Sequence, residues 1–369
     1  MQEQKTKSDV GSRRFSSPIL TSAVQWLERV DPGTHRRIKG LRLVTAYGIA
    51  AMLGTLPAIS HGLAHGILLS FLAAGFALWA SVSEGGATRP ESSRALLLLV
   101  AAAVAGAAVM ICLAPLLTGP GRPGPELTLA LGAFLVGYLK RFGVLGAGIG
   151  SQVFIGQLLA YNAHLTSSDL PMVLVAGLIA ALAAIVPRML SGPAEHPVAA
   201  LSGTAGDRLN ERAALFMGMQ AAVSAMIIVL LNDVIGLVES AWAITACTYV
   251  IASSMAGTID RVRRRILGTA IGVPLGLACL PLAIHAPFLV WISAALAMII
   301  YAMALPERYD IACGAYAFTL IVTMAATGEH SFMLLAARAW ETLVGGVIGL
   351  AAAMLMEPLR ASLFYKMKW

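Results

Sequence analysis

Residues 331–356 read SFMLLAARAWETLVGGVIGLAAAMLM, and this stretch decides the fold class. It is almost entirely apolar, but it contains two ionisable side chains, Arg338 and Glu341. A helix of about 20 such residues crosses the roughly 30 Å hydrocarbon core of a bilayer. The stretch therefore predicts a membrane-spanning helix. Because a charge inside the bilayer is costly unless it faces protein or water, Arg338 marks a candidate substrate or ion pathway.

The whole chain has the composition of a membrane protein. Of its 369 residues, 58% are hydrophobic and 12% are charged, and the mean hydropathy is +0.79. Soluble domains carry about 25% charged residues, so the sequence predicts an all-α polytopic membrane protein. It has no phosphate-binding loop and no nucleophile elbow, so we expect no enzyme and no cofactor. His61 and His65 lie four apart but offer too few ligands for zinc, so we expect no metal.

Twelve apolar runs have about the length of a membrane span. The expected spans are residues 42–60, 62–82, 95–117, 126–139, 142–160, 170–190, 212–231, 236–256, 266–283, 285–304, 309–326 and 331–356. The chain then divides into an N-terminal segment (1–41), a first six-helix repeat (42–190), a linker (191–211), a second six-helix repeat (212–358) and a tail (359–369). Apolar residues at helical spacing in 18–30 predict a short helix on the membrane surface. The alternative is a tail that orders only on a partner.

The basic residues predict the orientation in the membrane. Apart from Arg122 and Arg338, they fall in segments on one side, which also holds both termini. Cytoplasmic loops carry such an excess of Lys and Arg, so we expect both termini in the cytoplasm. For a bacterial protein this is the topology of a multi-pass inner-membrane protein. The basic charge therefore indicates topology, and we expect no nucleic-acid partner.

The two halves of the chain repeat each other. Gly86 and Arg94 recur as Gly257 and Arg265, 171 residues later. Each half has six expected spans, an even number, so both copies keep the same orientation. The repeat is therefore parallel, and a substrate pathway is expected where the halves meet. Only the second copy carries an ionisable pair inside its last span.

The second half also carries an ordered series of motifs. The series is Trp242-Ala243-Ile244-Thr245, Ala256-Gly257-Thr258, Arg261 to Arg265, Leu267-Gly268-Thr269-Ala270-Ile271-Gly272 and Gly345-Gly346-Val347-Ile348-Gly349. It resembles the fusaric acid resistance (FUSC) family, which includes bacterial aromatic acid exporters and is distantly related to the plant aluminium-activated malate transporters. The larger exporters carry substantial cytosolic domains after each six-span unit. This chain has only a short linker and tail there, so it resembles a compact form.

The resemblance implies an inner-membrane exporter of organic, in particular aromatic, carboxylates. Without an ATP-binding motif, its energy sources would be the proton gradient or the membrane potential. The expected partners are a small organic anion and the lipid bilayer, and a homo-oligomer remains an open option. Two alternatives stand beside this hypothesis: a passive anion channel, and an accessory membrane subunit that transports nothing.

The candidate substrate site centres on the last span. Arg338 is expected to bind the substrate carboxylate through its planar guanidinium fork. Glu341 would be the proton-responsive partner that releases Arg338 for the anion. The alternative is a structural ion pair between the two. Trp242, Thr245 and Tyr249 share one stripe of a span, which is either the wall of a site for a flat aromatic ligand or ordinary core packing.

Two further groups have structural interpretations as well. The basic cluster is either an anchor for topology and lipid headgroups or a cytosolic mouth that concentrates anions; it comprises Arg261, Arg263, Arg264 and Arg265. Small residues at helical spacing let a neighbouring helix approach closely. This packing role is expected for Gly268, Gly272, Gly276, Gly345 and Gly349.

Overall fold

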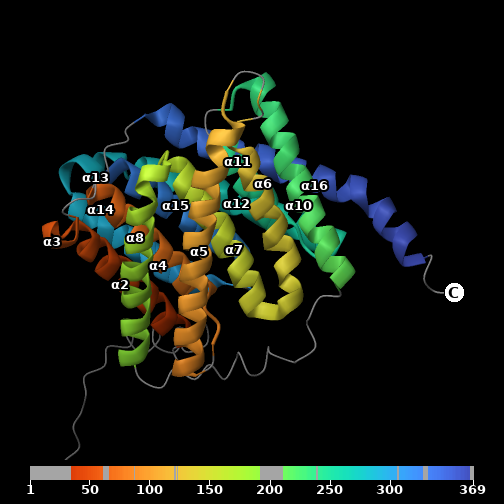
Figure 1. The fold of residues 1–369 in the computed structure, drawn as a ribbon. Coiled ribbons are helices and arrows are strands. Elements are labelled where there is room, and N and C mark those ends of the chain that lie inside the picture. The colour runs from red at the N-terminus through yellow and green to blue at the C-terminus, as the bar shows by residue number, and fades with distance from the viewer. Residues whose placement is uncertain are drawn as a thin grey trace, which may run out of the picture.

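The computed structural model describes residues 35–60, 66–86, 88–119, 122, 124–191, 211–237, 240–305, 307–326 and 331–365. Over these residues the fold is helical and contains no strand (Figure 1). The expected surface helix at 18–30, His61 and His65, and most of the linker at 191–211 lie outside the described residues.

The first half contains six main helices, each of which coincides with one expected span. They are α2 (His35–Thr55), α4 (Gly66–Ser83), α5 (Arg89–Leu117), α6 (Leu127–Tyr138), α7 (Gly143–Asn162) and α8 (Leu170–Leu190), with a short α3 (Pro57–Ser60) after α2. Helix α5 packs along α7 and α8, and α4 packs against α2 and α8. Buried apolar side chains of these helices form one core, with Phe76 and Leu99 fully buried in it.

The second half repeats this order. Its helices are α10 (Glu211–Ile235), α11 (Ser240–Val250), α12 (Met255–Ala278), α13 (Leu280–His285), α14 (Pro287–Ala304), α15 (Tyr309–Ala326) and α16 (Phe332–Tyr365). Helix α12 packs along α15 and α16, and α11 packs against α10 and α16. Each of these partners stands at the position in its half that α5, α7, α8, α4 and α2 hold in the first.

The helices have the length and composition of membrane spans. Five helical stretches are long and apolar enough to cross a bilayer, and three shorter apolar helices accompany them. The longest stretch, Leu127–Asn162, is not one straight helix, because a 3₁₀ turn, η2 (Leu139–Phe142), separates α6 from α7. Gly143 has φ +78° at this turn, a conformation that glycine adopts readily. The chain is therefore a multi-pass α-helical membrane protein.

The structure departs from the expected spans at residues 236–256, which do not form a continuous helix. Helix α11 has 11 residues, about 16 Å, and ends at Val250. The chain then leaves the helical path, because the Ser254 side chain accepts a hydrogen bond from the Gly257 amide and caps α12. The amide of Ala252 donates to the Thr258 hydroxyl at 3.1 Å, which satisfies a further backbone group in this connection. The tail beyond residue 358 also differs from a separate segment, because α16 continues to Tyr365.

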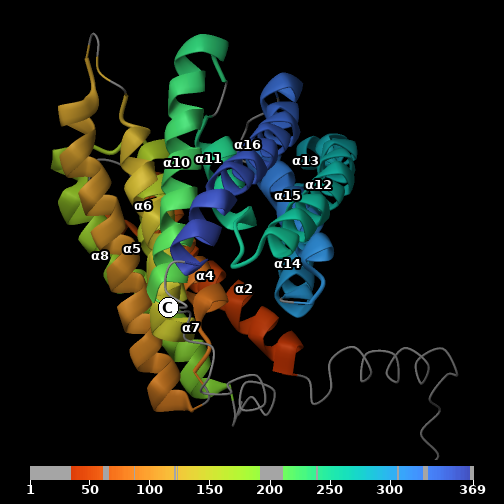
Figure 2. The ribbon, with the colours of Figure 1, turned by 90° about the vertical axis from the view of Figure 1, so that its right-hand side faces the viewer.

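The two halves meet through α2 against α14 and α10 against α6. Figure 2 shows α5, α6 and α8 on one side of the molecule and α12 to α15 on the other, with α10 between them. A second apolar core crosses this junction, since it contains Phe154 of α7 together with Ile228 of α10 and Ile244 of α11. At the surface, Arg36 donates to the Glu307 carboxylate at 2.6 Å and 3.3 Å, and this holds the pKa of Glu307 below its usual value. The pair is exposed, so it contributes little stability.

Candidate functional site

Arg338 lies inside the protein against an aromatic ring. Its guanidinium carbon stands 3.8 Å from the centroid of the Trp242 ring, and the arginine is only 7% exposed. Helix α16 supplies the arginine and α11 supplies the tryptophan, and these two helices pack along each other. A desolvated cation–π contact of this kind is worth about 2 kcal/mol. The arginine is therefore held in one orientation, with its planar face on the indole.

Glu341 and Thr342 continue the polar face of α16 from Arg338. Glu341 is 1% exposed and Thr342 is 9% exposed, so a carboxyl group and a hydroxyl lie in the protein interior beside the guanidinium's helix face. Arg338 stands six residues after the start of α16, about 9 Å along the helix axis. A charge pair at this depth needs protein contacts to offset its desolvation.

The other two members of the α11 stripe point to different partners. The Thr245 hydroxyl donates to the Ala241 carbonyl at 2.8 Å, so it is committed to its own helix. The Tyr249 hydroxyl lies 2.6 Å from the Ser151 hydroxyl of α7, and its ring meets Phe154 edge-on at 5.9 Å. The structure thus brings Trp242 to Arg338, and it places Tyr249 at the junction of the two halves.

An aromatic cluster that the sequence did not single out crosses the same junction. Trp79 of α4 meets Tyr316 of α15 with ring centroids 5.4 Å apart, and it meets Tyr301 of α14 at 6.3 Å. The two tyrosine rings lie 6.2 Å from each other. All three side chains are half-buried, so each keeps part of its surface accessible. The Tyr316 phenol lies within electrostatic range of both Arg338 and Arg265.

The four arginines expected at the cytosolic mouth do not form one group. They lie on α12 and not in a loop, and the helix turns them toward different partners. Arg261 donates to the Ile251 carbonyl at 3.2 Å, and Arg264 pairs with Asp260 at 2.8 Å. Arg263 is exposed. The expectation of a single basic mouth was wrong because successive residues of a helix point about 100° apart.

Arg265 is the member of this group that faces the interior. Its Nη1 donates to the Tyr309 hydroxyl at 3.3 Å, and the side chain is half-buried. Its Nε is buried and has no hydrogen-bond partner among the described residues. Among those residues it also makes no ion pair. Arg265 therefore retains capacity to bind an anion, with the rings of Tyr309 and Tyr316 nearby.

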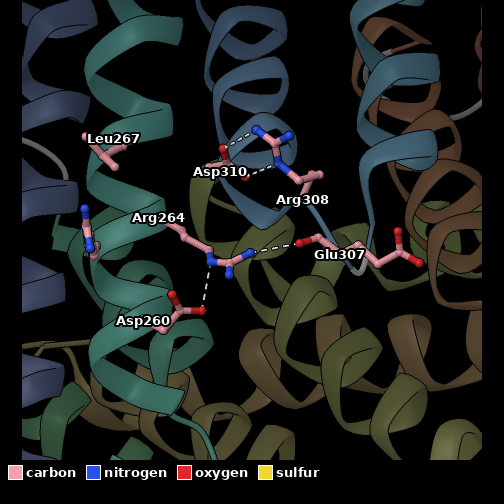
Figure 3. Close-up of a pocket in the computed structure, with 7 residues that line it drawn as sticks. Asp260, Arg264, Leu267, Glu307, Arg308 and Asp310 are labelled. Atoms are coloured by element: carbon pink, nitrogen blue, oxygen red, sulfur yellow. Dashed lines mark hydrogen bonds and ion pairs between the residues drawn. The ribbon is translucent and has the colours of Figure 1, made fainter. Parts of the chain in front are cut away.

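A surface pocket of about 400 Å³ lies where α12 meets the turn between α14 and α15 (Figure 3). Its lining is charge-balanced, because Arg264 pairs with Asp260 and Arg308 pairs with Asp310 at 3.0 Å. Arg264 also donates to the Glu307 carbonyl at 2.8 Å. A pocket whose charges are already paired does not concentrate anions. We therefore place the candidate site in the interior and not at this surface.

Glycines bring α12 and α16 against their neighbours. A Cβ at Gly272 would collide with the Gly314 carbonyl oxygen of α15, and its carbon would lie 2.9 Å away. Gly268 faces the same helix, and a Cβ at Gly276 would lie 2.8 Å from the Ile321 Cβ. On α16, a Cβ at Gly345 would collide with the Ala243 carbonyl oxygen of α11, and Gly349 faces Cys247 of that helix. This close approach sets Arg338 over Trp242.

Fold and interior site together define a polytopic α-helical membrane protein of a transporter class. Residues 224–352 match the family model described as fusaric acid resistance protein-like. The match extends from α10 to α16, and it contains Trp242, Arg265 and Arg338. The match supports membrane transport or efflux of organic acids, and the family is not one of enzymes. No curated protein sequence and no solved structure matches the chain.

Proposed function

We propose that this protein exports organic, in particular aromatic, carboxylates across the bacterial inner membrane. The observation that carries the proposal is the buried Arg338 on Trp242. A guanidinium whose plane rests on an indole still presents its N–H groups at the edge, where a carboxylate binds them in a fork. The half-buried rings of Trp79, Tyr301 and Tyr316 offer stacking surfaces for an aromatic substrate. Glu341 would be the proton-responsive neighbour.

In this proposal the chain is built from two parallel six-helix repeats with both termini in the cytoplasm. The matching partners of α5 and α12, and of α4 and α11, support the repeat. So do the aromatic contacts, because Trp79 of α4 reaches α15 as Tyr249 of α11 reaches α7, and the two residues stand 170 positions apart. The substrate would then pass where the halves meet, from Arg265 past Tyr316 to Arg338.

Export in this direction needs no ATP. An anion that leaves an inside-negative cell gains about 2.3 kcal/mol per charge per 100 mV. The membrane potential alone therefore favours export of a carboxylate, and a proton entering through Glu341 would add to the driving force.

The test is flux of a panel of aromatic and aliphatic carboxylates in proteoliposomes, with pH gradient and voltage set independently. We expect saturable flux of aromatic carboxylates that responds to the pH gradient. Glu341→Gln should retain flux but lose the dependence on pH, since the amide is fixed in a neutral form. A non-saturating current that is linear in voltage would favour an anion channel instead. Absence of flux for every carboxylate, in protein that remains folded, would overturn the proposal in favour of an accessory subunit.

A further inference from the structure

A buried basic cluster lies at one end of the first half, outside the pathway described above. Lys39 and Arg42 come from the first turns of α2, and Arg188 comes from the last turn of α8. Arg42 is 8% exposed and Arg188 is 2% exposed. The cluster also contains Glu84, 5% exposed, in the connection from α4 to α5. Four helices, α2, α4, α5 and α8, therefore converge on these charges.

The single carboxylate of this cluster is already occupied by neutral donors. The Gly86 amide and the Ser92 hydroxyl both donate to Glu84 Oε1 at 2.7 Å. Ser92 in turn accepts from Arg188 Nε at 2.8 Å. Lys39 donates at 2.7 Å to the backbone carbonyl of Glu84, not to its carboxylate. The hydrogen bonds thus fix Glu84 without bringing a carboxylate oxygen to Arg42.

Arg42 is left with unused donors. Its Nη1 and Nη2 are both buried, and neither has a hydrogen-bond partner among the described residues. Lys39 and Arg42 share the charge of one carboxylate, and neither forms an ion pair within the described part of the chain. Arg188 adds repulsion to Arg42. Burial lowers the pKa of the Lys39 ammonium below its usual value, and Glu84 only partly offsets this. A buried guanidinium with two free N–H edges needs an acceptor.

We propose that Arg42 binds a phosphate-type oxyanion at this junction, where Lys39 and Arg188 complete the positive surroundings. Two parallel N–H groups of a guanidinium match two oxygens of a tetrahedral phosphate, and an anion here would tie α2 to α8. The phosphate can come from the headgroup of an anionic phospholipid or from free phosphate. Basic pockets between membrane helices near the cytoplasmic surface bind such headgroups, which agrees with the proposed orientation. The site does not depend on the proposed transport activity.

The test measures the unfolding temperature of the purified, delipidated full chain in detergent. One arm titrates inorganic phosphate against chloride at constant ionic strength, and the other titrates short-chain phosphatidylglycerol against phosphatidylcholine. We expect a rise of the unfolding temperature with at least one phosphate probe, because a ligand of the folded state alone stabilises it. A rise with phosphatidylglycerol only assigns the headgroup, whereas a rise with inorganic phosphate assigns the free ion.

Three variants decide whether Arg42 is the ligand. Arg42→Gln should weaken the apparent affinity for the effective probe at least about tenfold, since it removes a charged, forked donor. Arg94→Gln, an exposed residue of α5 with the same charge change, should leave the affinity unaltered. Glu84→Gln keeps an acceptor for Gly86 and Ser92 but removes the negative charge, so it should tighten binding.

Two results would overturn the proposal. One is that neither phosphate probe stabilises the natural sequence beyond its control. The other is that Arg42→Gln binds the probe as tightly as Arg94→Gln does. If Arg42→Gln does not fold, Glu84→Gln decides, and an affinity equal to that of the natural sequence then counts against the site.

Discussion

Arg338→Lys should lower the rate of aromatic carboxylate transport by about 10- to 100-fold at an unchanged amount of folded protein. Lysine keeps the positive charge but loses the planar fork and the face that rests on Trp242. A charged hydrogen bond contributes about 1.5–3 kcal/mol, which corresponds to this range of rates. The measurement is initial flux into or out of proteoliposomes at matched protein density.

The matched control for this change is Arg94→Lys. Arg94 is an exposed arginine on α5, and the control makes the same chemical change away from the interior. We expect transport at the natural rate. If Arg338→Lys transports as well as the control, the guanidinium fork has no part in anion recognition.

Gly272→Ala should destabilise the protein by about 1–3 kcal/mol, a typical cost of overpacking. The added methyl group would collide with the Gly314 carbonyl oxygen, which belongs to the backbone of α15 and cannot move aside as a side chain does. Helix α12 would have to shift away from α15. We expect a lower unfolding temperature in detergent and less monodisperse protein on size exclusion.

Gly48→Ala separates close packing from helix propensity. Gly48 lies within α2, and no heavy atom beyond its own helix lies within 4 Å of a Cβ placed there. Both substitutions gain the same intrinsic preference of alanine for a helix, about 1 kcal/mol. Gly48→Ala should therefore be neutral or stabilising. Equal stability of the two variants would mean that α12 and α15 do not touch at Gly272.

Much of the fold follows from the sequence for one physical reason. A bilayer requires long apolar segments with every backbone group satisfied internally, so apolar runs predict helices directly. Charged side chains within such runs are rare, and this drew attention to Arg338 before its contact with Trp242 was visible. The weakest prediction was residues 236–256, because an apolar run does not reveal that Ser254 begins a new helix.

The sequence gave no account of which way each side chain points. Trp79 and Tyr316 lie more than 230 positions apart, and only the packing of the two halves brings their rings together. The four arginines of α12 looked equivalent in sequence, yet Arg265 turns inward to Tyr309. One signal could have been used, since Trp79 and Tyr249 stand at the repeat offset of 170. Arg42 was likewise assigned to the basic side for topology, and its burial depends on four converging helices.

The most direct test of the central claim is the double variant Arg338→Met, Glu341→Met. It removes both buried charges at once and keeps similar side-chain volume, so neither partner is left uncompensated. If Arg338 is the anion ligand, the double variant should fold with an unfolding temperature near that of the natural sequence and should not transport aromatic carboxylates. If it folds and transports them at the natural rate, the pair is only a structural salt bridge and the account is contradicted.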